Sequence, residues 1–160
     1  MKIGKLSLLK ELFSEILVPE EVYKEAVERG LHEGFSDALL IREGFDQGWI
    51  KVARLNEDET VFCREIHLGE AQAIVLARRT SATALLLMDE SSGRAFAEAW
   101  GLKVNGVFFV IMMALRRGLL SGVEAKEAVL TLVQKGLRIE PKLLAKVIRE
   151  IDAYKDSGTA

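Results

Sequence analysis

Residues 84–90 have the sequence Ala84-Leu85-Leu86-Leu87-Met88-Asp89-Glu90. An unbroken run of apolar residues that is followed at once by two acids is typical of a strand buried on both faces. Strands of this kind occur almost only in parallel sheets that are covered by helices. The stretch therefore decides the fold class, which we expect to be α/β with a parallel sheet.

Helices and short apolar strands alternate on both sides of this strand. We expect further strands at 16–18, 49–52 and 102–104, and helices at 5–13, 19–30, 36–43, 58–66, 70–79, 90–100, 107–117, 122–135 and 141–154. Pro19 suits the first position of a helix, and Gly69 is expected to separate two helices. The alternation predicts one domain at 1–154, followed by a frayed tail at 155–160.

The composition is that of a soluble globular protein. The chain has 160 residues, of which 49% are hydrophobic and 29% are charged, and this excludes a disordered or collagen-like chain. The longest stretch without a charge, 104–115, is too short to span a bilayer, so no membrane association is expected. A single cysteine, Cys63, predicts a cytoplasmic protein. Few Asn and Gln beside many Lys, Arg and Glu fit a thermophilic source.

The charges are distributed unevenly. Residues 1–80 hold 11 Lys and Arg against 15 Asp and Glu, whereas residues 81–160 hold 11 against 9. A solvated basic surface in the second half is one interpretation. A face that attracts phosphates, opposite an acidic pocket elsewhere, is the other.

Most familiar catalytic arrangements are absent from the sequence. No glycine-rich phosphate-binding loop follows a strand, and two histidines with one cysteine are too few for a zinc site of the usual kind. Cys63 and His67 stand four residues apart and could form a nucleophilic pair. A small buried Cys63 and a surface His67 are the favoured interpretation.

The acidic residues are the strongest candidates for a functional site. Asp89 and Glu90 follow a strand directly, Glu70 begins a helix, and Glu25 lies in the helix after the 16–18 strand. Singly, Asp89 could be a helix cap, Glu70 a partner of the helix dipole, and Glu25 a solvated residue. Together, at the carboxyl edge of a parallel sheet, they indicate a site for Mg²⁺ or Mn²⁺.

Several motifs resemble the PIN-domain superfamily, and in particular its prokaryotic branch of predicted nucleic-acid-binding proteins. The resemblance extends from residue 5 to about 120, which leaves 119–154 as a C-terminal helical extension of a PIN-like three-layer domain. The matching segments are Leu17-Val18-Pro19-x-x-Val22-Tyr23-x-Glu25, Gly48-Trp49-Ile50-Lys51-Val52, Leu68-Gly69-Glu70-Ala71-x-Ala73-Ile74-x-Leu76-Ala77, Leu86-Leu87-Met88-Asp89-Glu90 with Gly93-Arg94, and Gly101-Leu102-x-Val104-x-Gly106.

The resemblance implies an endoribonuclease that uses Mg²⁺ or Mn²⁺ to hydrolyse RNA phosphodiesters. Carried over by position, Glu25, Glu70 and Asp89 are the catalytic acids and metal ligands, and Glu90 is a further ligand. Three arginines are the candidates for holding the RNA backbone: Arg94, Arg116 and Arg117. Arg94 could equally pair with Asp89 or Glu90. Many relatives are toxins, which makes a small antitoxin protein a possible partner.

Two departures from the family pattern bear on activity. The family begins with a central strand that ends in a metal-binding Asp, and this sequence has no counterpart for it. The Gly-Thr after the last strand is replaced by Gly106-Val107. The lost strand would leave 16–18 and 84–88 unpaired with each other.

Three explanations for the missing strand stay open. The chain starts too late; the sheet closes up or takes a strand from a second copy, which gives an obligate dimer; or the protein is degenerate and kept for binding. A homodimer or higher oligomer is therefore expected. Two functions follow from them: a metal-dependent ribonuclease, and a catalytically inactive module that binds nucleic acid or protein.

Overall fold

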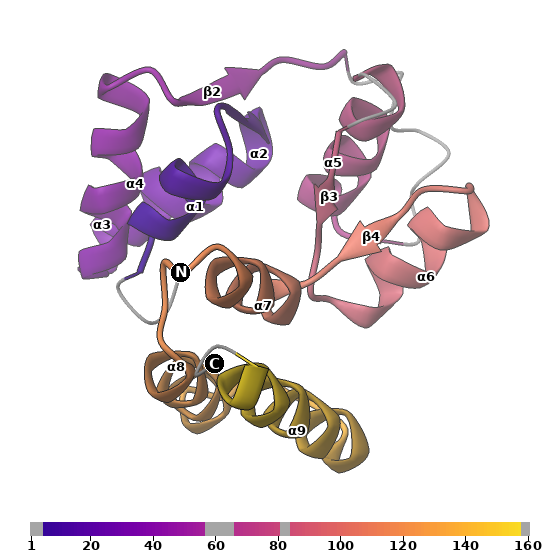
Figure 1. The fold of residues 1–160 in the computed structure, drawn as a ribbon. Coiled ribbons are helices and arrows are strands. Elements are labelled where there is room, and N and C mark those ends of the chain that lie inside the picture. Colours follow the sequence, from indigo (N-terminus) through magenta and orange to yellow (C-terminus); the bar gives the residue numbers. More distant parts are fainter. Residues whose placement is uncertain (1–4, 57–65, 81–83, 158–160) are drawn as a thin grey trace. The chain divides into compact units, whose positions relative to one another are not determined.

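The computed structural model describes residues 5–56, 66–80 and 84–157. In this part the chain is mostly helical with small parallel sheets, which confirms the mixed α/β class (Figure 1). It divides into two compact units. We call Phe13–Gly106 the strand unit, and Met1–Leu12 with Val107–Ala160 the helical unit. Cys63 and nearly all of the helix predicted at 58–66 lie outside the described residues.

Two pairs of parallel strands form in the strand unit. β1 (Ile16–Pro19) pairs with β2 (Ile50–Ala53), and β3 (Leu86–Leu87) pairs with β4 (Val104–Asn105). The strand predicted at 84–88 is therefore reduced to two residues. Within the described ranges β1 and β3 belong to different pairs, as the sequence predicted for these two segments.

A helical run connects β1 to β2. It consists of α2 (Glu20–Tyr23), the π-helical segment η1 (Lys24–Arg29), α3 (Gly30–His32) and then α4 (Ser36–Asp46). Pro19 ends β1 in an extended conformation and stands just before α2. The predicted helix end near Gly30 is wrong, because the run continues to His32. Gly30 is needed there for packing: a Cβ atom on it would lie 2.9 Å from the Ala38 Cβ.

The helices α5 (Leu68–Arg79) and α6 (Ser91–Ala99) enclose a small core with β3 and β4. Its buried members are Ile74, Leu86, Met88 and Ala97. Gly69 does not break a helix, contrary to prediction, but is the second residue of α5. A Cβ atom on Gly69 would lie 3.0 Å from a methyl group of Val22, so the glycine lets α5 approach α2.

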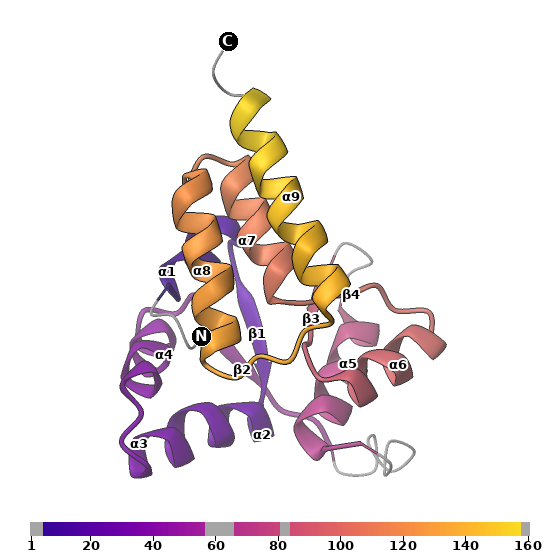
Figure 2. The ribbon, with the colours of Figure 1, turned by 90° about the horizontal axis from the view of Figure 1, so that it is seen from below.

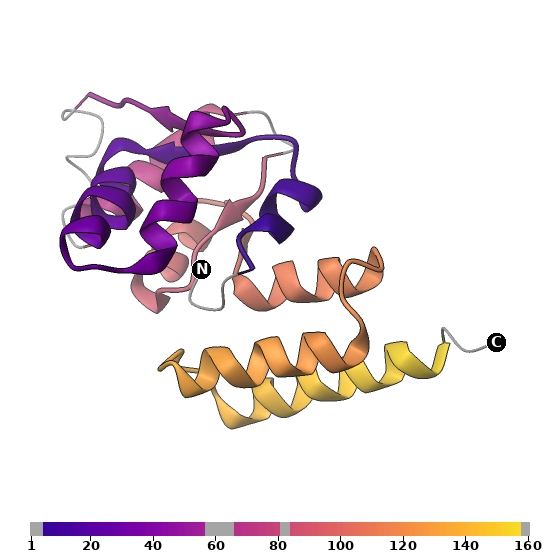
Figure 3. The same ribbon diagram turned by 90° about the vertical axis from the view of Figure 1, so that its left-hand side faces the viewer.

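The helical unit consists of α1 (Ser7–Leu12), α7 (Val107–Arg116), α8 (Gly122–Gln134) and α9 (Pro141–Ser157). α7 packs against the other three, and α8 and α9 lie side by side (Figures 2 and 3). Ser121 and Glu124 form a capping box that begins α8. α9 extends through Ser157, into the segment predicted as a tail. No helix in the described ranges is long and apolar enough to cross a membrane.

Candidate functional site

Glu70 is the centre of the candidate site in the strand unit. It is the third residue of α5, in the first turn, three residues after the N-cap residue His67. Its Oε2 atom is buried and has no hydrogen-bond partner among the described residues. A buried acceptor without a donor is costly, so this oxygen is available to a cation or to a hydrogen-bond donor.

The pKa of the Glu70 carboxyl is raised above its ordinary value. Burial is the largest cause, because it disfavours the charged form. Two effects of His67 lower the pKa of Glu70: its backbone N–H donates a hydrogen bond to the carboxylate, and the positive charge of its ring attracts the carboxylate. Glu90 and Glu25 then raise the pKa further by repulsion. The structure therefore brings three of the predicted acids within electrostatic reach of one another.

Two glycines let the acids approach. A Cβ atom on Gly93, in α6, would lie 2.9 Å from Cδ of Glu70 and 3.0 Å from its Oε1. A Cβ atom on Gly69 would lie 3.6 Å from Oε2 of Glu25. The absence of a side chain at Gly93 leaves room for the Glu70 carboxylate at the start of α6, and Glu25 lies beside α5.

Asp89 occupies a different position from Glu90, although the two are adjacent in the chain. Its Oδ1 lies against Gly106, where a Cβ atom would collide with it. The family pattern has a Gly-Thr at this point, and the glycine is the part that this chain retains. Asp89 itself is exposed.

Arg94 connects the ends of β3 and β4. Its Nη1 donates to the Met88 carbonyl at 2.8 Å, and its Nη2 donates to the Val104 carbonyl at 3.4 Å. Nη2 also lies 3.7 Å from a carboxylate oxygen of Glu98. The guanidinium thus has a clear structural role beside the acids, and its predicted role in holding RNA stays a prediction.

The other two predicted arginines lie in the helical unit. Arg116 and Arg117 are exposed, and Nη1 of Arg117 donates to the Leu12 carbonyl at 3.1 Å, which closes the end of α1. The Arg116 carbonyl accepts a hydrogen bond from the Tyr154 hydroxyl at 3.1 Å. The predicted role of both arginines in holding RNA stays a prediction.

The donor chemistry at Glu70 fits a hard divalent cation, whereas the geometry is incomplete. Carboxylate oxygens are the ligands that Mg²⁺ and Mn²⁺ prefer, and Oε2 of Glu70 is available. In the described part of the chain, however, no group of three His, Cys, Asp or Glu side chains converges closely enough to hold a metal ion. In proteins, Mg²⁺ often binds through only one or two carboxylates, and its other ligands are waters or phosphates.

The comparison with protein families decides the relationship. A PIN-domain family model (DUF3368) matches residues 1–153. The chain belongs to the PIN-domain family. No curated protein and no solved structure matches it. The match to the PIN family includes α8 and α9, which the motifs alone had left beyond the resemblance.

The matching segments contained Gly69 and Gly93, but sequence reasoning assigned neither glycine of this PIN domain a role beside the acids. Gly93 lies inside a helix, where alanine is about 1 kcal/mol more favourable. That unfavourable choice was the signal that a side chain has no room there. The sequence also could not predict that Glu90 and Asp89 have different neighbours, because the turn after β3 determines where each side chain points.

Gly93→Ala tests how tightly the site is packed. The new Cβ atom would lie 2.5 Å from Sδ of Met88 and 2.9 Å from Cδ of Glu70, so both groups must move. We expect overpacking of about 1–3 kcal/mol, offset in part by about 1 kcal/mol of helix propensity. Urea unfolding measures the net change in the free energy of unfolding. Ser92→Ala, at an exposed position of the same helix, is the control. A Gly93→Ala protein more stable than Ser92→Ala would show that the site tolerates a methyl group.

Proposed function

We propose that this PIN-family chain is a divalent-metal-dependent ribonuclease whose site is centred on Glu70. The observation that supports it most directly is the buried Oε2 of Glu70, which has no hydrogen-bond partner among the described residues. A protein gains no stability from such an atom, since its desolvation is not compensated. A cation that binds there supplies the missing partner.

The residues of this chain would share the work as follows. Glu70 and Glu90, with Glu25 beside α5, supply the carboxylate oxygens, and Asp89 stands at the neighbouring edge near Gly106. When bound, Mg²⁺ or Mn²⁺ polarises the phosphate and makes a bound water more acidic. Glu70, with its raised pKa, is more readily protonated than an ordinary carboxyl while no cation is present. Gly93 keeps the Glu70 carboxylate in one place.

A second candidate is a PIN-family module that binds RNA without cleaving it. One observation favours it: the described residues contain no group of three side chains that could hold a metal ion. In that case the acids would be inherited and unused. Both candidates bind RNA, and they differ in whether the RNA is cleaved.

Metal-dependent cleavage of RNA separates the two candidates. We expect the full chain to cleave a single-stranded RNA in Mg²⁺ or Mn²⁺ and to stop when EDTA removes the ion. Gel analysis of the products measures the cleavage, and the Glu70→Gln protein prepared in the same way excludes a contaminating nuclease. Salt-sensitive RNA binding with no turnover in either metal would favour the second candidate and overturn the first.

The partner predictions remain proposals. RNA follows from either candidate, whereas a small antitoxin protein and a homodimer or higher oligomer rest on the resemblance alone. Size-exclusion chromatography with light scattering measures the oligomeric state.

A further inference from the structure

The division into two units coincides with a division of charge. The helical unit carries 12 Lys and Arg against 7 Asp and Glu, a net charge of +5. The strand unit carries 10 against 17, a net charge of −7. The acids of the candidate site belong to the negative unit, which by itself repels a polyanion such as RNA.

Basic side chains gather on one exposed face of α9. Lys142, Lys146 and Arg149 are all exposed, and at 100° per residue they lie within an arc of about 60°. They extend over about 10 Å of the helix. The buried side chains Val147 and Ile151 lie on the opposite side of α9, where the helix packs in its unit. We call these three cations the α9 stripe.

The stability of the helix does not account for the α9 stripe. Lys142 lies in the first turn of α9, which contains no acidic residue. The positive end of the helix dipole makes this turn unfavourable for a cation. The only acidic partner that approaches the stripe at ion-pair distance in the described structure is Glu150, whose Oε1 is 3.9 Å from Nζ of Lys146. Both side chains are largely exposed, so this pair is weak.

The residues between the cations favour phosphate over a protein partner. The other exposed residues of the same face are the small Ala145 and Ala153 and the acidic Glu150. Protein interfaces are built around large apolar and aromatic anchors, and this face offers none. A row of cations without aromatic residues suits contacts with the backbone of a nucleic acid and not with its bases.

We propose that the α9 stripe is the surface of this protein that binds the phosphates of RNA. The choice of RNA rests on the proposed function, whereas the placement on α9 rests on the charge and exposure of the stripe. The helical unit then supplies the attraction that the acidic strand unit lacks. Binding is independent of sequence, because the stripe contacts only the backbone.

The test measures binding in EDTA, where cleavage does not contribute. A labelled oligouridylate of about 20 nucleotides is titrated by fluorescence anisotropy at several salt concentrations. The triple variant Lys142→Gln, Lys146→Gln, Arg149→Gln should lose three phosphate contacts. Each contact contributes about 0.7 to the slope of log K against log salt, so the slope should become smaller by about 2. At about 0.1 M salt this corresponds to about 100-fold weaker binding.

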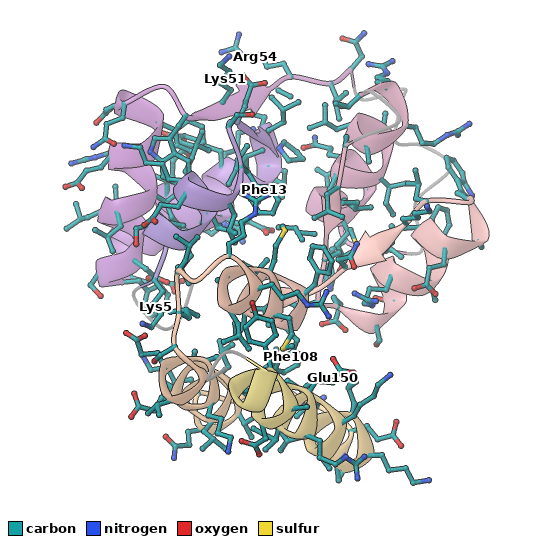
Figure 4. All side chains as sticks on the ribbon, in the orientation of Figure 1. Lys5, Phe13, Lys51, Arg54, Phe108 and Glu150 are labelled. Atoms are coloured by element: carbon teal, nitrogen blue, oxygen red, sulfur yellow. The ribbon has the colours of Figure 1, made fainter. Side chains whose placement is uncertain are left out.

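A matched triple variant in the strand unit controls for net charge. Lys24→Gln, Lys51→Gln and Arg54→Gln remove the same charge from exposed positions; Lys51 and Arg54 are labelled in Figure 4. We expect this control to bind within about twofold of the wild type. Glu150→Gln, at the labelled position on α9 in Figure 4, should tighten binding because it removes the acid beside the stripe.

A charge-reversal variant and a DNA oligonucleotide distinguish the possible outcomes further. Lys142→Glu should weaken binding while the midpoint of urea unfolding stays equal or rises, since an anion suits the first helical turn. An oligodeoxyuridylate should show the same loss in the triple variant, because phosphate contacts do not sense the 2′-hydroxyl. A loss confined to RNA, equal losses in both triple variants, or wild-type binding by the α9 variant would overturn the proposal. Binding through α9 without any cleavage would instead contradict the proposed function alone.

Discussion

Glu70→Gln is expected to reduce metal-dependent RNA cleavage at least about 100-fold, the upper end of what losing a supporting partner costs a metal site. Glutamine keeps the size of the side chain and can still accept the hydrogen bond from the His67 backbone, so α5 should begin at the same residue. What is lost is the charge at the buried oxygen. Glu28→Gln, which removes an exposed carboxylate from η1, is the matched control and should leave cleavage within about twofold.

The same substitution should raise stability at neutral pH. Because the folded state raises the pKa of Glu70, the folded protein binds the proton more tightly than the unfolded chain does. The contribution of Glu70 to stability is therefore present at low pH and is lost as the pH rises through the folded pKa. Between about pH 4 and about pH 7, the free energy of unfolding measured in urea should fall less for Glu70→Gln than for the wild type.

Metal binding gives an independent measure of the same residue. At about ten times its Kd, a bound ion stabilises the folded state by about 1.4 kcal/mol. This should raise the Tm of the wild type by about 3–6 °C and leave the Tm of Glu70→Gln unchanged. Equal metal-induced shifts in both proteins, or full cleavage by Glu70→Gln, would place the metal elsewhere.

Ile74→Ala is expected to destabilise the strand unit by about 2–5 kcal/mol. Ile74 is completely buried on α5, one turn after Glu70, and it packs with Leu86, Met88 and Ala97. Removing its side chain leaves a cavity in a core of few residues. Since proteins of this size have only about 5–15 kcal/mol of stability, the loss is a large fraction of the total.

Two milder substitutions calibrate this prediction. Ile74→Val should cost only about 0.5–1.5 kcal/mol, because it removes a single methyl group. Leu68→Ala, at a half-exposed position at the start of the same helix, should cost less than Ile74→Ala. Urea unfolding followed by circular dichroism measures all three. An Ile74→Ala protein as stable as Leu68→Ala would mean that the core around α5 collapses to fill the cavity.

The helices were the most predictable part of the fold. The helices expected at 107–117 and 122–135 appear as α7 and α8, each within one residue of its expected ends. Their apolar residues recur at the helical period, and this signal is local. The strands were less predictable, because a strand exists only where a neighbour pairs with it. The apolar run 84–88 forms only two residues of β3, since β4 offers two paired residues.

The candidate site was predicted in its residue types and only partly in its arrangement. The acids Glu25, Glu70 and Glu90 were singled out from their positions near strand ends and helix starts. Glu25 and Glu90 lie within electrostatic reach of Glu70, and the role of the three acids in a site stays a prediction. The role of Gly93 was not foreseen, because it depends on the approach of α6 to Glu70, which no local pattern encodes.

The sequence by itself determined the α/β class and the relation to the PIN family, because both follow from local patterns of polarity and spacing. Only the tertiary structure decided that one oxygen of Glu70 is buried without a donor among the described residues, and that Asp89 lies against Gly106. It also decided that the basic and acidic residues separate into two units. Burial and electrostatic repulsion depend on distances in space, and residues far apart in the chain set those distances.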